Sequence, residues 1–246
     1  MIVLPNQVYA EPGGIPLTFD FFRPDNGVPP LLVFLHGGGW ISGDKSMYRE
    51  EAAWFAERGF ACACISYRLA PLHPYPSAVE DALAFVRYAR AEAEELQIDA
   101  NRIGAMGNSA GAHLAAMLGV LPDRVQAVVD VCGITDLTNP RDVHLPIAMA
   151  FLEQFMGCSH DGNEAKWAEA SPITHVNPAS APFLIIHGDM DDVVPLEQSR
   201  SFHSRLGQAG VSSELKIMPG EGHSFSWEAW VAIRELSLKF FERELV

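Results

Sequence analysis

A serine flanked by glycines is the first group in this chain whose surroundings indicate chemistry. The segment Gly107-Asn-Ser-Ala-Gly111 follows an apolar run and precedes a stretch of small residues. This G-x-S-x-G pattern is typical of a nucleophile elbow, a sharp strand-to-helix turn that exposes the serine hydroxyl. Glycines suit such a turn because they remove side chains that would clash in it. The pattern predicts that Ser109 is a nucleophile.

A serine hydroxyl attacks efficiently only when a base removes its proton, and the base needs a carboxylate to orient it. Residues 187–195 follow an apolar run and contain three acids: Asp189, Asp191 and Asp192. Residues 220–225 supply His223 on a glycine-flanked loop. Serine, acid and histidine therefore occur in the chain order expected of hydrolases that carry such an elbow.

A glycine run supplies the second requirement of acyl transfer, which is an oxyanion hole of backbone N–H groups. The segment His36-Gly-Gly-Gly-Trp40 directly follows a buried apolar run. Without Cβ atoms, its backbone can approach a substrate closely. We expect the N–H groups of Gly38, Gly39 and Ala110 to hold the negative oxygen, each contributing about 3 kcal/mol to transition-state stabilisation.

Alternating strands and helices must position these groups. The apolar patterns predict eight strands, at 7–10, 17–23, 31–35, 60–67, 102–106, 125–131, 183–186 and 214–218. They predict five main helices, at 47–58, 76–95, 110–119, 196–209 and 227–244. This alternation favours a mostly parallel sheet with helices on both faces. The candidate groups would then meet at the carboxyl ends of the strands.

One α/β domain accounts for a chain of 246 residues, of which 48% are hydrophobic and 20% charged. Residues 133–181 alone break the rhythm, and we expect them to form a small lid-like insertion. The net charge of −14 argues against nucleic acid or an anionic membrane as a partner, because both select clustered Lys and Arg. Nothing in the sequence decides the oligomeric state, so a homodimer stays open.

The four cysteines show no paired metal-site spacing, which favours reduced core thiols over disulfides or metal ligands. The first residues lack the basic and apolar regions of a secretory signal, and no apolar stretch is long enough to span a bilayer. We therefore expect a cytoplasmic location.

Taken together, these motifs resemble those of the α/β-hydrolase carboxylesterases, in particular the hormone-sensitive-lipase-like and the compact acetyl-xylan/feruloyl esterase-like groups. The resemblance covers nearly the whole chain. It implies the α/β-hydrolase fold, Asp191 as the acid of the triad with Ser109 and His223, and neither a metal nor an organic cofactor. Asn108, where hormone-sensitive-lipase relatives commonly carry aspartate, and the short N-terminal region lean toward the compact esterases.

We therefore predict a serine carboxylesterase for small, neutral, short-chain acyl esters, because no extended lipid-binding cap is visible. An arylformamidase or peptidase would use the same triad. A non-catalytic ligand-binding homologue is a remote alternative, since such receptors have lost the histidine. The residues expected to contact substrate are Trp40, Asn108, Val193 and Phe225, with Ile41, Tyr75 and Phe151 as further candidates for the pocket wall.

Several polar residues have simpler structural interpretations. His36 and His187 are expected to brace the oxyanion loop and the acid loop. Arg68 and Asp81 are expected to form an internal ion pair. The remaining histidines lack motif context, and packed or solvated roles are favoured for them: His73, His113, His144, His160, His175 and His203.

Overall fold

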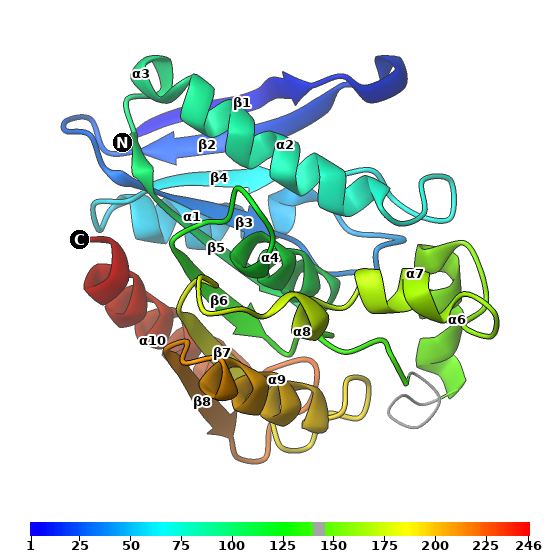
Figure 1. Cartoon of the computed structure of the whole chain (residues 1–246). Coiled ribbons are helices and arrows are strands. Elements are labelled where there is room, and N and C mark those ends of the chain that lie inside the picture. The colour runs from blue at the N-terminus through cyan, green and yellow to red at the C-terminus, as the bar shows by residue number, and fades with distance from the viewer. Residues whose placement is uncertain (140–145) are drawn as a thin grey trace.

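The computed structural model describes residues 1–139 and 146–246, which form one eight-stranded sheet in the order β1-β2-β4-β3-β5-β6-β7-β8 (Figure 1). The strands are β1 (Ile2–Ala10), β2 (Leu17–Arg23), β3 (Pro30–Leu35), β4 (Ala61–Ile65), β5 (Asp99–Asn108), β6 (Ala127–Val131), β7 (Phe183–Gly188) and β8 (Ser213–Met218). Only β2 runs antiparallel to its neighbours, and the other pairings are parallel. The predicted mostly parallel sheet is confirmed.

Continuous apolar runs form the central strands because helices cover both of their faces. Every residue of β3, β4, β6 and β7 is buried. The first strand is longer than predicted, since it begins at Ile2 and pairs with β2 through two irregularities in register. Its exposed residues carry no alternating pattern that would mark the extra length.

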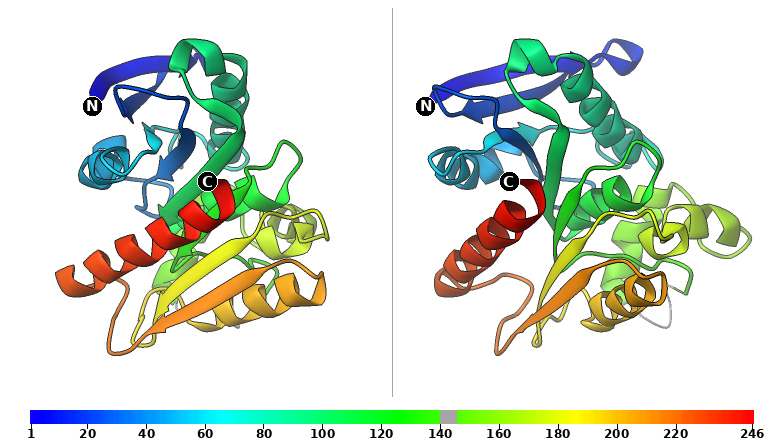
Figure 2. Two further views of the ribbon diagram at one scale, coloured as in Figure 1. Left: turned by 90° about the vertical axis from the view of Figure 1, so that its left-hand side faces the viewer. Right: turned by 60° about the vertical axis from the view of Figure 1, so that its left-hand side comes forward.

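Helices α1 (Arg49–Ala56) and α10 (Trp227–Leu245) cover one face of the sheet (Figure 2). Helices α2 (Ser77–Ala91), α4 (Ala110–Val120) and α9 (Glu197–Gln208) cover the other face. The remaining short elements are η1 (Pro12–Gly14), η2 (Lys45–Tyr48), α3 (Ala93–Leu96), α6 (Pro146–Met156), α7 (Glu164–Glu169) and α8 (Pro172–His175).

Two predicted helices are divided. The segment 47–58 contains the end of the 3-10 turn η2, then α1, and it ends before Gly59, whose φ of +95° cannot continue a helix. The segment 76–95 contains α2 and the short α3, with Glu92 between them in a non-helical conformation.

Helix α4 is the central element of the site because it begins directly after Ser109. All of its residues are buried. Its small side chains let it approach the sheet closely, and it packs against β5 and β6. A helix buried on every side is held firmly, so the residues at its first turn have little freedom to move.

The predicted insertion contains α6, α7 and α8, which follow β6 (Figure 1). Helices α6 and α7 project away from the sheet on the side opposite the two termini. Residues 140–145 of this insertion, including His144, lie outside the described residues. The lid-like role of the segment stays a prediction.

The predicted Arg68–Asp81 ion pair is confirmed. Arg68 Nη2 lies 2.7 Å from Asp81 Oδ1, and the backbone N–H of Arg68 donates to Asp81 Oδ2 at 2.8 Å. The contact fastens the loop after β4 to α2. Within the described part of the chain, no helix combines the length and the apolar character needed to cross a membrane.

Candidate active site

Ser109 stands at the junction of β5 and α4 with φ +54° and ψ −122°, a combination that non-glycine residues rarely adopt. A Cβ on Gly107 would collide with the backbone of Gly111, and one on Gly111 would collide with the carbonyl of Leu35. The N–H of Ser109 donates to Val131 O at 2.9 Å. The predicted tight strand-to-helix turn is therefore present, and it holds the serine at the carboxyl end of the sheet.

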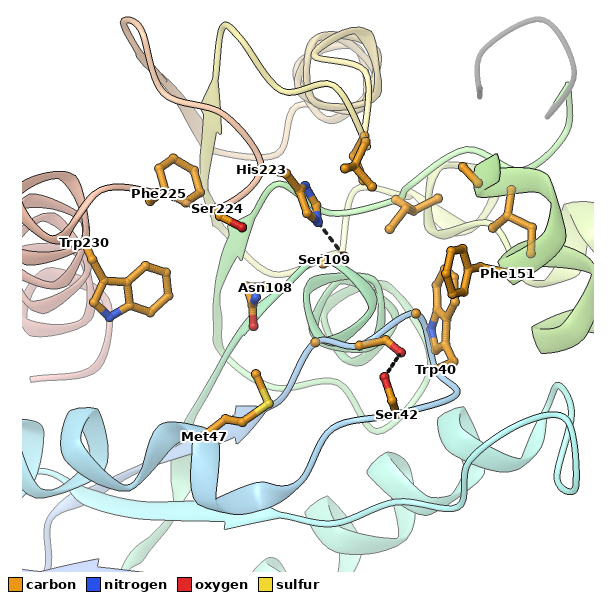
Figure 3. Close-up of a pocket in the computed structure, with 18 residues that line it drawn as sticks. Trp40, Ser42, Met47, Asn108, Ser109, Phe151, His223, Ser224, Phe225 and Trp230 are labelled. Carbon is orange, nitrogen blue, oxygen red and sulfur yellow. Dashed lines mark hydrogen bonds between the residues drawn. The ribbon is translucent and has the colours of Figure 1, made fainter. Parts of the chain in front are cut away.

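The three predicted triad residues form one chain of hydrogen bonds (Figure 3). His223 Nε2 lies 3.1 Å from Ser109 Oγ. On the other side of the ring, His223 Nδ1 lies 2.8 Å from Asp191 Oδ2. Because the carboxylate accepts a hydrogen bond from Nδ1–H, the other nitrogen, Nε2, is unprotonated and can accept the proton of the serine hydroxyl.

Of the three candidate acids, the structure brings only Asp191 to His223. The side chain of Asp191 is fully buried, whereas Asp189 and Asp192 are exposed. Asp189 instead accepts a hydrogen bond from the N–H of Gly220 at 2.6 Å. The choice of Asp191, which rested on family resemblance, agrees with this geometry.

Four donors keep the Asp191 carboxylate charged. Burial acts to raise the pKa of Asp191, but hydrogen bonds from His187 and His223 outweigh it and hold the pKa well below its usual range. The N–H groups of Val193 and Val194 both donate to Asp191 Oδ1, at 2.9 and 2.8 Å. A carboxylate held in this way accepts from imidazole without taking its proton.

The glycine loop lies beside the serine with unused backbone donors. Gly38 and Gly39 have φ values of +117° and +61°, and a Cβ on Gly38 would collide with Ser42 O. The Gly38 carbonyl is held by the Ser42 hydroxyl at 2.9 Å and the Ser42 N–H at 3.1 Å. Among the described residues, the N–H groups of Gly38, Gly39 and Ala110 donate no hydrogen bond. They are therefore available to a ligand.

His36 braces this loop as expected. Its ring stacks on Tyr67 with centroids 4.3 Å apart, and Nδ1 lies 2.8 Å from Gly37 O. Burial lowers the pKa of His36. His187 likewise braces the acid loop, because Nε2 lies 2.9 Å from Val194 O and 3.3 Å from Asp191 Oδ2.

A pocket of about 510 Å³ opens over Ser109. Its lining consists of Gly37, Gly38, Gly39, Trp40, Ser42, Met47, Asn108, Ser109, Ile134, Ala148, Phe151, Leu152, Val193, Val194, His223, Ser224, Phe225 and Trp230. All four predicted substrate contacts belong to this lining, as does Phe151. The predicted wall residues Ile41 and Tyr75 do not. Tyr75 turns into the core, where its ring packs edge-on against Phe155.

Ser109 lies between two apolar parts of the pocket. Met47, Phe225 and Trp230 stand on one side of it, and Trp40 and Phe151 stand on the other (Figure 3). Trp230 is anchored, because its Nε1–H donates to Glu51 Oε1 at 2.6 Å. Sequence reasoning missed Met47 and Trp230, which come from helical segments whose patterns indicate only burial.

One group of potential metal ligands occurs among the described residues: Cys132, Asp191 and His223, with ligand atoms within 4.8 Å of one another. Two of its members already share a hydrogen bond. Burial raises the pKa of the Cys132 thiol well above its usual value, which disfavours the thiolate that metals bind. All four cysteines are free thiols.

Comparisons with known proteins identify the family to which the chain belongs. Residues 19–206 match the protein family described as BD-FAE. Esterase LipC of Mycobacterium tuberculosis is 33% identical over 213 residues, which cover 80% of this chain and 53% of LipC. Esterase LipQ of the same organism is 30% identical over 243 residues, which cover 91% of this chain and 58% of LipQ. The chain thus spans about half the length of the curated relatives it matches.

Solved structures match more completely. Esterase Est2 of Thermogutta terrifontis, solved with butyrate bound, is 27% identical and has a TM-score of 0.85 over 97% of this chain and 93% of that one. Esterase 2 of Thermogutta terrifontis phosphonylated by sarin is 26% identical and has a TM-score of 0.87 over 97% of this chain and 94% of the other.

Proposed function

The chain is a member of the BD-FAE family with the α/β-hydrolase fold predicted from its sequence, and we propose that it is a serine carboxylesterase for small, short-chain acyl esters. The observation that carries the proposal is the chain of hydrogen bonds from Ser109 through His223 to Asp191. Ser109 and His223 both line the pocket. The esterase relatives support the reaction class.

In the first half of the proposed reaction, Ser109 Oγ attacks the ester carbonyl while His223 Nε2 takes its proton. Asp191 keeps the imidazole oriented and stabilises its positive charge. The N–H groups of Gly38, Gly39 and Ala110 bind the negative oxygen of the tetrahedral intermediate. The intermediate collapses when the carbon–oxygen bond to the alcohol breaks, and His223 returns its proton to the leaving oxygen.

In the second half, water enters the place of the alcohol. His223 removes a proton from this water as it attacks the acyl carbon, and a second tetrahedral intermediate forms. Its collapse releases the acid and returns the proton to Ser109 Oγ. The cycle uses groups of the chain and water alone.

The pocket supports small, neutral substrates. Its volume lies within the range of about 300–1,000 Å³ that small-molecule sites occupy. Among the described residues, its lining carries no lysine or arginine that would pair with an anionic substrate. We propose that Trp40, Asn108, Val193 and Phe225 contact the substrate, with Asn108 held in place by the Tyr48 hydroxyl at 3.1 Å.

Rates on p-nitrophenyl esters from acetate to palmitate test this proposal, with N-formylkynurenine and a peptide substrate in parallel. We expect the highest kcat/KM on acetate to butyrate. Faster turnover of palmitate would contradict the short-chain preference. Faster turnover of N-formylkynurenine or of the peptide would identify an amide-directed hydrolase, and no turnover with no labelling of Ser109 by a fluorophosphonate would identify a ligand-binding protein.

We further propose that the protein acts in the cytoplasm as a single-domain enzyme on small molecules. The four free cysteines support a reducing compartment. The net charge of −14 is unfavourable for nucleic acid. Sedimentation analysis would decide between a monomer and a homodimer.

A further inference from the structure

A buried histidine connects three parts of the site: helix α4, the glycine loop 36–40 (the oxyanion loop) and the insertion that follows β6. His113 lies one turn after Ser109 in α4, and its backbone N–H donates to Ser109 O at 3.0 Å. Its side chain is fully buried and both ring nitrogens have partners. Nε2 lies 2.8 Å from Ala170 O, and Nδ1 lies 3.2 Å from Trp40 Nε1. Because a carbonyl only accepts, Nε2 carries the proton and Nδ1 accepts from the indole N–H.

The indole that His113 holds belongs to the oxyanion loop. Trp40 directly follows Gly39 and has a φ of +60°, so its backbone sits in the left-handed region. Its ring stacks on Phe155 of α6 with centroids 4.2 Å apart, and its carbonyl accepts from the Ala70 N–H at 2.9 Å. The direction of the Gly38 and Gly39 N–H groups therefore depends on where this indole is anchored.

We propose that His113 is a positioning residue that sets the oxyanion loop, because it ties the Trp40 indole to the nucleophile helix and to the insertion at Ala170. This inference rests on the proposed esterase function. His113 touches neither substrate nor reacting atoms, since it is absent from the pocket lining. It acts through Trp40, whose position fixes the loop donors relative to Ser109.

Loss of the histidine should affect the transition state more than the bound substrate. Without Nδ1, the buried indole N–H has no acceptor, and a buried donor without a partner is costly enough to move the side chain. Movement of Trp40 shifts the Gly39 N–H away from the oxyanion. An interaction that strengthens as negative charge develops contributes to kcat rather than to KM.

His113→Leu and Trp40→Phe provide the test, singly and combined. Each single variant should lower kcat by about 10- to 100-fold and change KM by less than about threefold, because one oxyanion donor accounts for about 10²–10³ in kcat. The double variant should lose little more than either single variant, since both break the same hydrogen bond. Trp40→Phe keeps an aromatic ring against Phe155, so it serves if His113→Leu does not fold.

A trifluoromethyl ketone separates positioning from general loss of structure. Its adduct with Ser109 carries an oxyanion, so its inhibition constant should rise by the same factor as kcat/KM falls. Phe183→Leu is the matched control. Phe183 belongs to β7 and packs against Gly119, which lies at the end of α4 far from Ser109. It should lower Tm and leave kcat and the inhibition constant unchanged.

Additive losses in the double variant would overturn the inference, as would a lowered Tm with kcat and inhibitor affinity unchanged. Fluorophosphonate labelling keeps the two proposals apart. If the wild type labels at Ser109 and hydrolyses esters, an unaffected His113→Leu contradicts only the positioning role. If the wild type neither labels nor turns over esters, the esterase proposal fails and the positioning role fails with it.

Discussion

His187 Nε2 lies 3.3 Å from the same oxygen of Asp191 that accepts a hydrogen bond from His223 Nδ1. The other nitrogen of His187 lies 2.7 Å from Ser199 Oγ, so the hydroxyl donates to it and fixes the tautomer. A second histidine therefore shares the triad carboxylate from within the core. It helps to hold the carboxylate in the position from which it orients His223.

Removal of this second donor should lower activity. His187→Leu leaves Asp191 with one fewer hydrogen bond, so the carboxylate is held less firmly in the position from which it orients His223. We expect kcat/KM to fall about tenfold, the value of a hydrogen bond to a charged group. His187→Gln, which keeps a donor, should lose less. An unchanged kcat/KM in both variants would contradict this role.

A methyl group on the oxyanion loop should abolish most activity. Gly38→Ala places a Cβ against Ser42 O at a φ of +117°, so the loop must move. We expect kcat to fall by about 10²–10³, as for loss of an oxyanion donor. Gly59→Ala is the control, because its φ is +95° and a Cβ there meets nothing within 4 Å. It should cost about 1 kcal/mol of stability and leave kcat unchanged. Equal kcat losses in both variants would show that backbone strain, and not the loss of an oxyanion donor, lowers the activity.

The sequence motifs predict most of the site, because the residues that carry its chemistry lie in short segments. Ser109, its two flanking glycines and the loop 36–40 each need particular residue types at adjacent positions, so their spacing alone indicates their role. The sheet was predictable for a similar reason, since strands buried on both faces must be apolar throughout. Choosing Asp191 over Asp189 required family resemblance, because all three acids share one loop.

The remaining contacts depend on the folded chain. His113 carries no motif, and its partners Trp40 and Ala170 are 73 and 57 positions away. Ile41 and Tyr75 were expected in the pocket wall, but side-chain direction in a loop has no fixed period. Trp230 reaches the pocket from the closing helix, whose amphipathic pattern does not reveal what lies beyond its buried face.

A buried acid near the site should make stability depend on pH. Burial raises the pKa of Asp130 to about 6, and its Oδ2 atom has no partner among the described residues. The folded state therefore binds a proton that the unfolded state does not bind between pH about 4 and 6, so acidification through this window stabilises the fold. Above it, the ionised form costs about 3 kcal/mol.

Asp130→Asn should remove this dependence. The amide keeps an oxygen for the Gly133 N–H, which donates to Asp130 Oδ1 at 2.8 Å. We expect a higher Tm than the wild type at pH 8 and a similar Tm near pH 4.5. Burial also lowers the pKa of His113 to about 4, which acts in the opposite direction as the pH falls, so the variant should lose stability more steeply on acidification. A lower Tm at pH 8 would contradict the prediction.

Pocket shape should set the preferred chain length. Phe151 is 39% exposed and its ring stands over Gly39, so it closes one side of the pocket. Phe151→Ala should raise kcat/KM on octanoate relative to acetate by about tenfold, as one or two added methylenes do when a pocket admits them. Leu72→Ala is the control, because Leu72 is 86% exposed and absent from the lining. An unchanged ratio of octanoate to acetate kcat/KM in Phe151→Ala would show that the acyl group of the substrate occupies another part of the pocket.

The acyl-enzyme is the most direct test of the proposed esterase. The protein is mixed with p-nitrophenyl acetate, quenched in acid within the first turnovers, digested and analysed by mass spectrometry. The expected result is an acetyl group on Ser109, and neither acetylation nor turnover in Ser109→Ala. Full turnover with no acetylated Ser109 peptide, or activity retained in Ser109→Ala, would contradict it.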